Sequence, residues 1–217
     1  PMEKQYQIAS VLDKVTNLIS LRKQQLAKLD ELVNARFVEM FRDPVCNSKN
    51  LPTERGASFF KLSNGKFVPE SRRLKVGIPA YGGNGISRYT DGASIKKDTL
   101  VVGHAGFQSG NIHFAKGPLW ITDNAMYISD YNTEQFNLFF LYSLMEHIDF
   151  TRFQDAGDLK KITQKPFMNV EYIMPPMQLQ REYVAFAEQT DRSKLTIQQS
   201  LDKLEVLKKA LMQEYFG

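Results

Sequence analysis

Both ends of the chain show the apolar spacing of long amphipathic helices. Apolar residues recur at steps of three and four, a period close to 3.5, in the segments 1–41 and 176–216. Neither segment contains Gly or Pro after its opening Pro, which is tolerated there because the first helical turn has no internal partner for that N–H. We therefore predict two helices, each about 60 Å long. The predicted seam residues are Ile8, Leu12, Val15, Leu18, Leu26, Leu29, Leu32, Leu201, Leu204, Leu207 and Leu211.

The two helical segments are copies of one another. Residues 1–41 align with residues 176–216 without a gap, at a constant offset of 175. A narrow apolar seam on a long helix must be covered by another helix. One copy leads into the middle of the chain and the other leads out, so we expect an antiparallel pair; a coiled-coil handle that joins two chains is the alternative. The identical pairs are Pro1/Pro176, Met2/Met177, Gln5/Gln180, Gln24/Gln199, Leu26/Leu201, Lys28/Lys203, Leu29/Leu204, Leu32/Leu207, Ala35/Ala210, Glu39/Glu214 and Phe41/Phe216.

The middle of the chain changes character sharply. Alternating apolar and polar positions, rich in β-favouring residues and separated by Gly, Asn and Asp, indicate a β-rich domain. The predicted fold class is therefore α+β, with a first spacer helix in 1–43, a β-rich domain in 44–170 and a second spacer helix in 171–217. Strands are predicted within 66–70, 74–81, 99–107, 111–122 and 124–129.

A single helix is predicted inside the middle domain. The sequence EQFNLFFLYSLMEH, from Glu134 to His147, has helical spacing, and Thr133 is its candidate N-cap. We expect the rest of the domain to consist of strands and loops. The predicted buried face of this helix is formed by Phe136, Phe139, Phe140 and Leu144.

Charge is distributed unevenly along the chain. Of the 217 residues, 42% are hydrophobic, enough for a folded core, and the formal net charge is +4. Residues 44–170 hold the whole excess, with 15 Lys and Arg against 11 Asp and Glu, whereas the flanking segments hold 13 of each. A basic middle domain is compatible with phosphate contacts.

Composition also excludes some classes of protein. No run approaches the roughly 18 apolar residues of a membrane span, and the N-terminal segment is too rich in charge and glutamine for a signal peptide. We therefore expect a cytoplasmic protein without a membrane partner. Cys46 is the only cysteine, which excludes a disulfide framework and a cysteine-rich zinc site, and we expect it to be an inert buried thiol.

The segment 81–90 combines glycine with hydrogen-bonding and cationic side chains. Its sequence, YGGNGISRYT, would let the backbone approach a ligand closely while polar side chains offer hydrogen bonds. A tight turn that needs glycine for left-handed backbone is one alternative. A nucleotide phosphate loop is another, although the segment lacks the Lys-Ser/Thr ending and the full G-x-G-x-x-G pattern. The candidate contacts are Tyr81, Gly82, Gly83, Asn84, Gly85, Ser87 and Arg88.

Three further segments carry polar side chains in predicted loops. They are 103–111, 120–124 and 153–165, and the last mixes lysines with hydrogen-bonding residues. Such a mixture suits the edge of a nucleic acid, but a solvated basic loop has the same composition. The candidate contacts in these segments are His104, Gln108, Asn111, Lys160, Lys161 and Lys165.

The histidines do not support a metal site or an enzyme. His104, His113 and His147 form no close ligand pair in the sequence, so no metal is predicted. Asp123 is expected to cap a turn. An acid–base pair of Asp123 with His104 is the alternative, but no motif supplies a nucleophile. We predict no catalytic residue and no cofactor.

Several motifs in this order resemble the specificity subunits of type I restriction-modification enzymes. They are the YGGNG segment, then VVGHAGFQSGNIHFAKGPLWITDNAMYI, then the NVEYIMPPMQLQREYV approach to a long helix. That family alternates target-recognition domains with helices that begin at a Pro-Pro-hydrophobic-x-x-Gln signature. Residues 175–180, PPMQLQ, fit this signature, and the first copy retains PMEKQ. The resemblance covers nearly the whole chain, although a full subunit has two recognition domains and only one is present.

The resemblance implies a partner for each part of the chain. The helices would bind methyltransferase subunits, a restriction and translocase subunit would join the larger complex, and the middle domain would read one half of a split target in double-stranded DNA. The chain would be either part of a longer subunit or a half-subunit that pairs with a second copy or another recognition half. No N-P-P-Y/F tetrapeptide for adenine methylation is present.

The implied DNA contacts divide into two kinds. Base-edge contacts are expected from Asn84, Arg88, Gln108 and Asn111. Phosphate contacts, which are sensitive to salt, are expected from Lys96, Lys97, Lys160, Lys161 and Lys165. The alternative function is an assembly protein, in which the coiled coil dimerises and the β-rich domain binds protein.

Overall fold

The computed structural model describes residues 2–216, apart from the side chains of Lys4 and Phe216. The chain forms two compact units. One consists of the residues up to Met40 together with those from Tyr183 onward, and the other is the continuous stretch 41–182.

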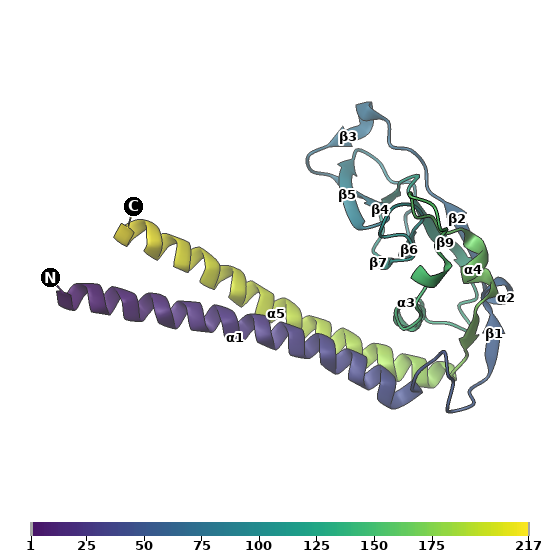
Figure 1. The fold of residues 1–217 in the computed structure, drawn as a ribbon, viewed down its shortest axis with the longest axis horizontal. Coiled ribbons are helices and arrows are strands. Elements are labelled where there is room, and N and C mark those ends of the chain that lie inside the picture. Colours follow the sequence, from purple (N-terminus) through teal and green to yellow (C-terminus); the bar gives the residue numbers. More distant parts are fainter. Residues whose placement is uncertain (1, 217) are drawn as a thin grey trace. The chain divides into compact units, whose positions relative to one another are not determined.

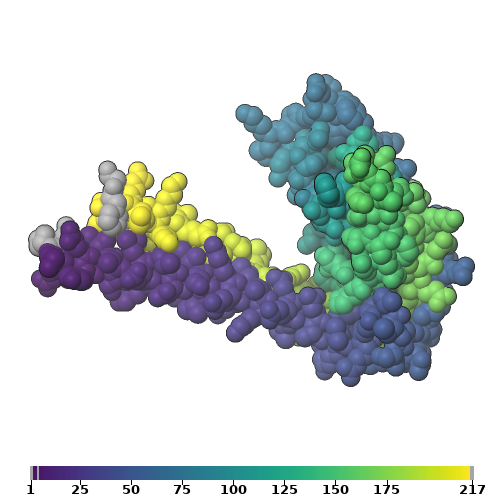
Figure 2. Space-filling model, in the orientation of Figure 1, coloured from purple at the N-terminus to yellow at the C-terminus, as the bar shows by residue number. Residues whose placement is uncertain are grey.

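Two helices of 40 residues, α1 (Met2–Phe41) and α5 (Met177–Phe216), confirm the predicted pair of long helices. Within the first unit they run side by side in opposite directions (Figures 1 and 2). Lys23 Nζ lies 3.1 Å from a carboxylate oxygen of Glu205, and Lys194 Nζ lies 2.6 Å from one of Asp30. From Lys23 to Asp30 the residue number rises along α1, whereas the partner on α5 changes from Glu205 to Lys194. The two helices are therefore antiparallel.

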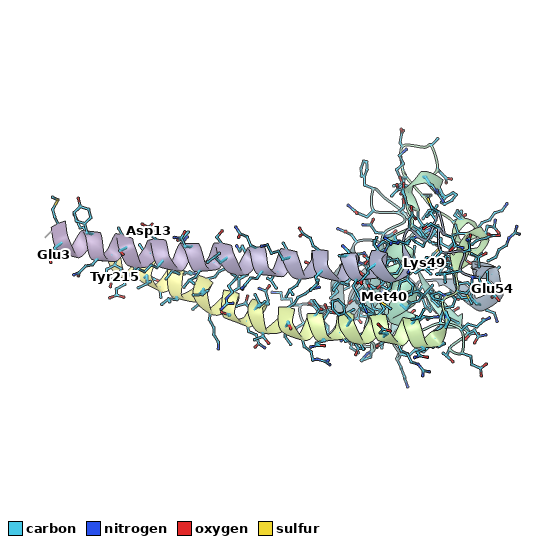
Figure 3. All side chains as sticks on the ribbon, turned by 90° about the horizontal axis from the view of Figure 1, so that it is seen from below. Glu3, Asp13, Met40, Lys49, Glu54 and Tyr215 are labelled. Atoms are coloured by element: carbon cyan, nitrogen blue, oxygen red, sulfur yellow. The ribbon has the colours of Figure 1, made fainter. Side chains whose placement is uncertain are left out.

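Both ends of the helix pair confirm that α1 and α5 are antiparallel. In Figure 3, Tyr215, near the end of α5, lies at the level of the first turns of α1, at the opposite end of the pair from Met40. At the other end of the pair, the Phe37 and Tyr183 rings meet edge to face with centroids 5.5 Å apart, and both are buried. The predicted antiparallel pairing within one chain is therefore confirmed.

The seam between the helices follows a heptad pattern whose phase differs from the prediction at three positions. Leu18, Leu32 and Leu207, predicted to lie on the seam, are exposed. In each case the next residue along the chain takes the seam instead, because the steps of three and four alternate strictly. The observed seam is Ile8, Leu12, Val15, Ile19, Arg22, Leu26, Leu29, Val33, Arg36 and Met40 on α1, with Tyr183, Ala187, Thr190, Lys194, Ile197, Leu201, Leu204, Lys208 and Leu211 on α5.

The second unit is rich in strands, as predicted, and its described residues form three sheets. One four-stranded sheet has the order β2-β9-β6-β7 and is antiparallel throughout. The other has the order β3-β5-β4-β8, with β4 and β8 parallel, and β1 pairs with β10. The elements are β1 (Thr53–Arg55), α2 (Gly56–Phe59), β2 (Phe60–Asn64), η1 (Glu70–Arg72), β3 (Arg73–Leu74), β4 (Ile78–Gly82), β5 (Gly85–Thr90), β6 (Thr99–Gly103), β7 (Ile112–Ala115), β8 (Trp120–Ile121), β9 (Ala125–Tyr131), α3 (Leu138–Glu146), η2 (Thr151–Phe153), α4 (Gln164–Asn169) and β10 (Glu171–Ile173).

Strand β6 lies at the centre of the domain. All five of its residues are buried, because both faces of its sheet are covered. On one face, the ring of Phe114 in β7 lies 5.5 Å from that of Phe139 in α3. On the other face, Val101 and Ala115 pack with Ile121 of the second sheet. This layering holds the ends of β4, β6 and β8 close together.

The predicted helix of the middle domain is shorter than expected. It begins at Leu138 rather than Glu134, because Asn137 caps it: the Asn137 side chain accepts hydrogen bonds from the N–H groups of Phe139 and Phe140. The proposed cap Thr133 lies in a turn outside the helix. Phe139, predicted to be buried, is half-buried against the sheet.

Other local predictions for the middle domain need correction. The segment 66–70 is not a strand, since most of it is irregular and its last residue starts η1. Residues 104–107 do not continue the strand before them, and 111–122 is two strands rather than one. The domain also contains two unpredicted short helices, α2 and α4, and α4 takes up the end of the predicted loop 153–165.

Two further findings concern the exposure of Cys46 and the search for membrane-spanning helices. Cys46 is exposed, so the prediction of a buried thiol is wrong; it lies in a turn where its N–H and that of Val45 point to the carboxylate of Asp43. Among residues 2–216, no helix combines the length and apolar character needed to cross a bilayer.

Gln180 fastens the first turn of α5 to the rest of the second unit. Its side chain is fully buried, its Oε1 accepts a hydrogen bond from the N–H of Asn137 at 2.9 Å, and its Nε2 donates to the carbonyls of Gln135 and Pro175 at 2.8 and 2.9 Å. The amide therefore uses one acceptor and both donors. This explains why the PPMQLQ segment ends in a glutamine. Gln5, its counterpart in the first copy, is exposed.

Candidate nucleic-acid interface

The glycine-dense segment 81–90 is a β-hairpin. Strands β4 and β5 pair up to Gly82 and Gly85, leaving Gly83 and Asn84 as a two-residue turn. Gly85 has a φ of +87°, a left-handed conformation that favours glycine. The tight-turn interpretation is therefore correct for the backbone.

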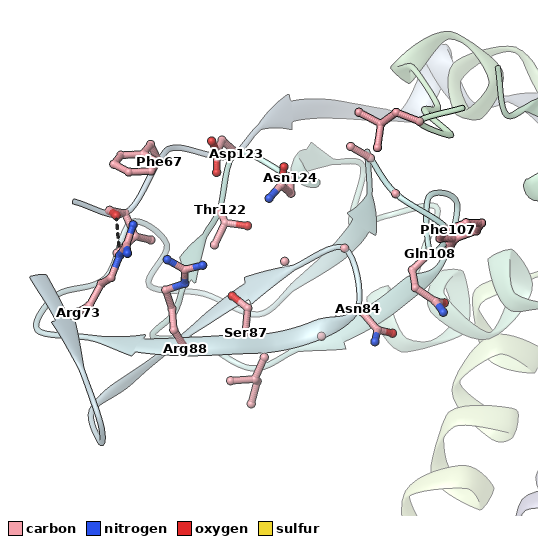
Figure 4. Close-up of a pocket in the computed structure, with 18 residues that line it drawn as sticks. Phe67, Arg73, Asn84, Ser87, Arg88, Phe107, Gln108, Thr122, Asp123 and Asn124 are labelled. Carbon is pink, nitrogen blue, oxygen red and sulfur yellow. Dashed lines mark hydrogen bonds between the residues drawn. The ribbon is translucent and has the colours of Figure 1, made fainter. Parts of the chain in front are cut away.

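The hairpin forms one wall of a cleft of about 690 Å³ (Figure 4). The second wall is the turn that follows β6, and the third is the turn between β8 and β9. Glycine allows the first two walls to meet: a Cβ on Gly103 would lie 2.8 Å from the carbonyl oxygen of Gly83. The lining residues are Phe67, Val68, Arg73, Gly82, Gly83, Asn84, Gly85, Ile86, Ser87, Arg88, Ala105, Gly106, Phe107, Gln108, Thr122, Asp123, Asn124 and Leu159.

Backbone hydrogen bonds fix the three walls to one another. The N–H of Thr122 donates to the carbonyl of Tyr81 at 2.9 Å, which ties the third wall to the hairpin. The N–H of His104 donates to the carbonyl of Asn124, also at 2.9 Å, which ties the third wall to the second. The cleft is therefore built into the sheet structure rather than formed by a free loop.

Two histidines outside the cleft lining contact backbone carbonyls of the cleft walls and of the neighbouring segment. His113 Nε2 lies 3.3 Å from the carbonyl oxygen of Gly83, and His104 Nδ1 lies 2.7 Å from that of Ile162. Each imidazole can donate to its carbonyl as the appropriate neutral tautomer. His104 therefore fastens the turn after β6 to the segment 155–162, and it does not line the cleft. Asp123, predicted to cap a turn, lies in the turn between β8 and β9, but its side chain makes no capping hydrogen bond with the described residues.

The segment 155–162 runs alongside the second wall. Ala105 and Lys161 form an antiparallel bridge, and the N–H of Gly106 donates to the carbonyl of Lys160 at 2.8 Å. The Lys160 and Lys161 side chains therefore start from a segment at the edge of the cleft. Neither lines the cleft itself.

The structure brings together seven of the predicted contact residues. In Figure 4 the Arg88 side chain points from β5 into the cleft, toward the wall that carries Thr122. Its guanidinium forms no ion pair with any residue of 2–216. Ser87 Oγ donates to the carbonyl of Ala80 at 3.1 Å, which leaves its lone pairs available. The seven are Gly82, Gly83, Asn84, Gly85, Ser87, Arg88 and Gln108.

The other predicted contact residues lie elsewhere. Tyr81 packs against the core between the two sheets, and burial raises the pKa of its hydroxyl. Asn111 donates a hydrogen bond to Gln108 and lies at the margin of a second hollow. Lys96 and Lys97 are exposed in the connection between β5 and β6, and Lys165 lies in α4.

Several lining residues were not predicted. Arg73 bonds to the carbonyl of Val68 and to Glu70, and its guanidinium lies 5.6 Å from the Phe67 ring centroid. Phe107 stands at the margin near Gln108 (Figure 4). Phe107, Leu159 and the Asp-Asn turn lie in segments that the sequence marked as candidate loops, whereas nothing local marked Phe67 or Arg73. The unpredicted lining residues with side chains that can contact a ligand are Phe67, Arg73, Phe107, Thr122, Asp123, Asn124 and Leu159.

The arrangement is suited to reading the edges of bases. Amide, hydroxyl, guanidinium and carboxylate groups converge on one hollow, and between them they can donate to purine acceptors and accept from adenine or cytosine amino groups. Glycines on two walls let the backbone approach the ligand.

Known proteins resemble this chain in sequence and in fold. Residues 56–208 match the family described as the type I restriction modification DNA specificity domain. S.HindORF215P of Haemophilus influenzae, described as a type I restriction enzyme specificity subunit, is 26% identical over 122 residues, which are 55% of this chain and 31% of that protein.

Solved structures with the same fold come from type I systems. The S subunit from M. genitalium superposes with a TM-score of 0.67 at 17% identity, over 99% of this chain and 59% of that one. The HsdS subunit from Thermoanaerobacter tengcongensis superposes with a TM-score of 0.59 at 16% identity, over 97% and 56%. A third structure, from work on complex assembly and conformational transition of the type I R-M system, gives 0.64 at 17%, over 99% and 59%.

The chain spans about a third of the curated relative and somewhat more than half of each solved structure. The matched family segment runs from the start of the β-rich domain through most of α5 and covers more than half of the chain. The chain therefore belongs to the family of type I restriction-modification DNA specificity domains.

Proposed function

We propose that this chain is a non-catalytic DNA-recognition component of a type I restriction-modification enzyme. The β-rich domain reads one half of a split target in double-stranded DNA. The long helices bind the methyltransferase subunits, and a restriction and translocase subunit joins the larger complex. A second copy of the chain, or another recognition half, reads the remaining half of the target.

The observation that carries this proposal is the cleft between the β4–β5 hairpin and the turn after β6. Asn84, Arg88 and Gln108, expected to contact bases, come from two separate elements and line the same hollow. Arg88 is half-buried and has no ionic partner among residues 2–216, so two of its guanidinium nitrogens are available to donate to guanine O6 and N7.

Methylation mapping tests the proposal directly. Cells would express this chain with its cognate methyltransferase subunit, and control cells would express the methyltransferase subunit alone. Genome-wide mapping of methylated adenine should reveal a split motif that depends on this chain, and the motif should be symmetric if two copies pair. A stable complex that methylates no chain-dependent motif would contradict the proposal.

Arg88 provides a sharper test within the same experiment. Removing a bidentate base contact costs about 1–3 kcal/mol of discrimination, so Arg88→Ala should relax the motif at one position. Arg55→Ala is the matched control, because Arg55 is exposed in the same domain but lies outside the cleft. If Arg88→Ala left the motif and its occupancy unchanged, the assignment of the hairpin as a base-reading element would be lost.

Salt dependence separates the phosphate contacts from the alternative of a protein-binding domain. Removing one lysine–phosphate pair should reduce the slope of log affinity against log salt by about 1. The double variant Lys160→Ala/Lys161→Ala should therefore bind duplex DNA more weakly and with a slope reduced by about 2. An affinity insensitive to salt would favour the assembly function.

The helices offer a surface for the methyltransferase subunits outside their own seam. Val11, Leu18, Leu21 and Leu32 are exposed along α1, and three of the four are separated by multiples of seven residues. Positions seven apart face the same side of a coiled-coil helix, so these side chains form an apolar stripe beside the seam. Exposed apolar groups at regular spacing are typical of a helix that packs against another partner.

A co-purification experiment tests this surface. Leu18→Ser/Leu21→Ser should abolish co-purification with the methyltransferase subunit while leaving the helical content unchanged. Asn17→Ser/Gln24→Ser is the matched control, since both side chains are exposed on the same part of α1 and neither occupies the position of Val11, Leu18 and Leu32 in the seven-residue repeat. Equal retention of the methyltransferase subunit by both variants would remove α1 from the interface.

A further inference from the structure

Phe107 is the most exposed large apolar side chain among those that the structure describes. It is 88% exposed, although phenylalanine favours burial, and Leu159 is 58% exposed. Both line the cleft. Holding two large apolar groups in water at a binding site is unfavourable unless a ligand covers them.

The backbone brings the two segments that carry these side chains together. Ala105 and Lys161 form an isolated antiparallel bridge, with Phe107 two residues after Ala105 and Leu159 two residues before Lys161. Both side chains border the same cleft. Gly106, between Ala105 and Phe107, has a φ of +93°, and a Cβ placed on it would have no neighbour within 4 Å. The turn at Gly106 therefore has open space beside it, and the adjoining Phe107 side chain is exposed.

The surroundings of Phe107 match the chemistry of duplex DNA. Lys160 and Lys161 follow Leu159 directly in the sequence, so cationic side chains flank the apolar pair. The hydrogen-bonding side chains of Gln108 and Asn84 lie next to it in Figure 4. An apolar group between cations and base-reading amides suits a ligand with an anionic backbone and an apolar stack inside it.

We propose that Phe107, backed by Leu159, inserts as a wedge between two neighbouring base pairs of the recognised half-site. This inference rests on the proposed DNA-reading function and adds its physical mode. Insertion unstacks one step and bends the duplex, and the ring recovers the lost stacking by covering the exposed base face. Steps that unstack easily, such as pyrimidine–purine steps, are then favoured without any hydrogen bond to their bases.

Fluorescence of 2-aminopurine tests the wedge with the full chain. The probe is a duplex selected from a random-sequence library by the wild-type chain, with 2-aminopurine replacing each adenine in turn. Unstacking makes this base brighter, so binding should raise the fluorescence at one step only. Phe107→Ser should abolish the rise and weaken binding on the order of 10-fold, as expected when one aromatic ring no longer stacks on a base.

Two further variants make the test specific. Phe107→Leu should keep most of the fluorescence rise, because leucine also serves as a wedge. Val76→Ser is the matched control: Val76 is 82% exposed in the same domain and does not line the cleft, so neither fluorescence nor affinity should change.

The outcomes distinguish failure of the wedge from failure of the proposed function. If the wild-type chain binds the selected duplex without any rise, the wedge is wrong and DNA reading stands. If replacing one thymine with uracil weakens wild-type binding as much as Phe107→Ser does, then Phe107 contacts a thymine methyl group and the wedge is also wrong. If Phe107→Ser impairs only binding of the methyltransferase subunit, Phe107 belongs to a protein interface. If no duplex is selected, both proposals fail.

Discussion

Replacing Gln180 should destabilise the second unit far more than an ordinary substitution in a helix. In Gln180→Leu the side chain keeps a similar volume, but one hydrogen bond to the N–H of Asn137 and two to backbone carbonyls are lost. The Gln180 side chain is fully buried, so a leucine of similar volume fills the same space without becoming exposed to water.

The magnitude follows from the groups left behind. A net hydrogen bond contributes about 1 kcal/mol, and a buried backbone group without a partner costs about 1–3 kcal/mol. Two of the three partners are only partly buried, so water can replace the amide there at a smaller cost. We therefore expect a loss of about 2–4 kcal/mol in the free energy of unfolding.

The assay is urea unfolding at neutral pH followed by two probes. Trp120 is the only tryptophan and lies in the second unit, so its fluorescence reports that unit, while far-ultraviolet circular dichroism reports mainly the long helices. Gln178→Leu is the control, because Gln178 is exposed two residues earlier and should change stability by less than about 0.5 kcal/mol.

Gln180→Glu separates the need for an amide from the need for shape. A carboxylate keeps the acceptor but places oxygen against the two carbonyls that Nε2 now contacts, so this variant should be at least as unstable as Gln180→Leu. The reasoning is refuted if Gln180→Leu unfolds at the same urea concentration as Gln178→Leu.

Three other variants are expected to give clear results. Gly103→Ala should greatly reduce DNA binding, because its Cβ would clash with the carbonyl oxygen of Gln108 in the second wall and would lie 2.8 Å from that of Gly83 in the first; unchanged affinity would show that these walls adjust without loss of binding. The hydrogen bond and charge of Asp43 raise the pKa of the Cys46 thiol, so Asp43→Asn should speed alkylation of Cys46 at about pH 8, where more thiolate forms; an equal rate contradicts this. Burial alone would lower the pKa of Lys194, but two aspartates raise it, so its stabilising effect is present below about pH 10 and is lost as pH rises through the folded pKa. Urea unfolding of Lys194→Met should therefore approach that of the wild type only at high pH, and a constant difference would exclude this linkage.

Sequence periodicity predicted the long helices well because each depends on contacts with one neighbouring helix. The phase of the seam was harder to predict. Leu18 and Ile19 both fit a three- or four-residue step from Val15, and only the partner helix decides which one is covered. Both residues are apolar, so residue type does not distinguish them, and the predicted Leu18 is exposed.

Some residues of the candidate site could likewise be predicted from the sequence, and others could not. The hairpin residues from Gly82 to Arg88 were predictable because glycine, asparagine and arginine are adjacent in the sequence. Phe107 could not be identified, since a phenylalanine after an apolar strand is typical of a core. Its exposure results from the turn at Gly106 and from the pairing of Ala105 with Lys161, 56 residues away in the sequence, which no local pattern encodes.

The pairing of β1 with β10 has a consequence for how such chains can be rebuilt. Thr53 faces Ile173 in this ladder, and the N–H of Met174 donates to the carbonyl of Pro52 at 2.7 Å, so the chain enters and leaves the β-rich fold at a single point. A segment whose two ends meet can be exchanged as a cassette without changing the spacing of its attachment points. Transplanting residues 53–173 between relatives should therefore transfer target preference as one unit, provided that the contacts across its boundary, such as those of Gln180 and the packing of Phe41 on Phe140, are matched.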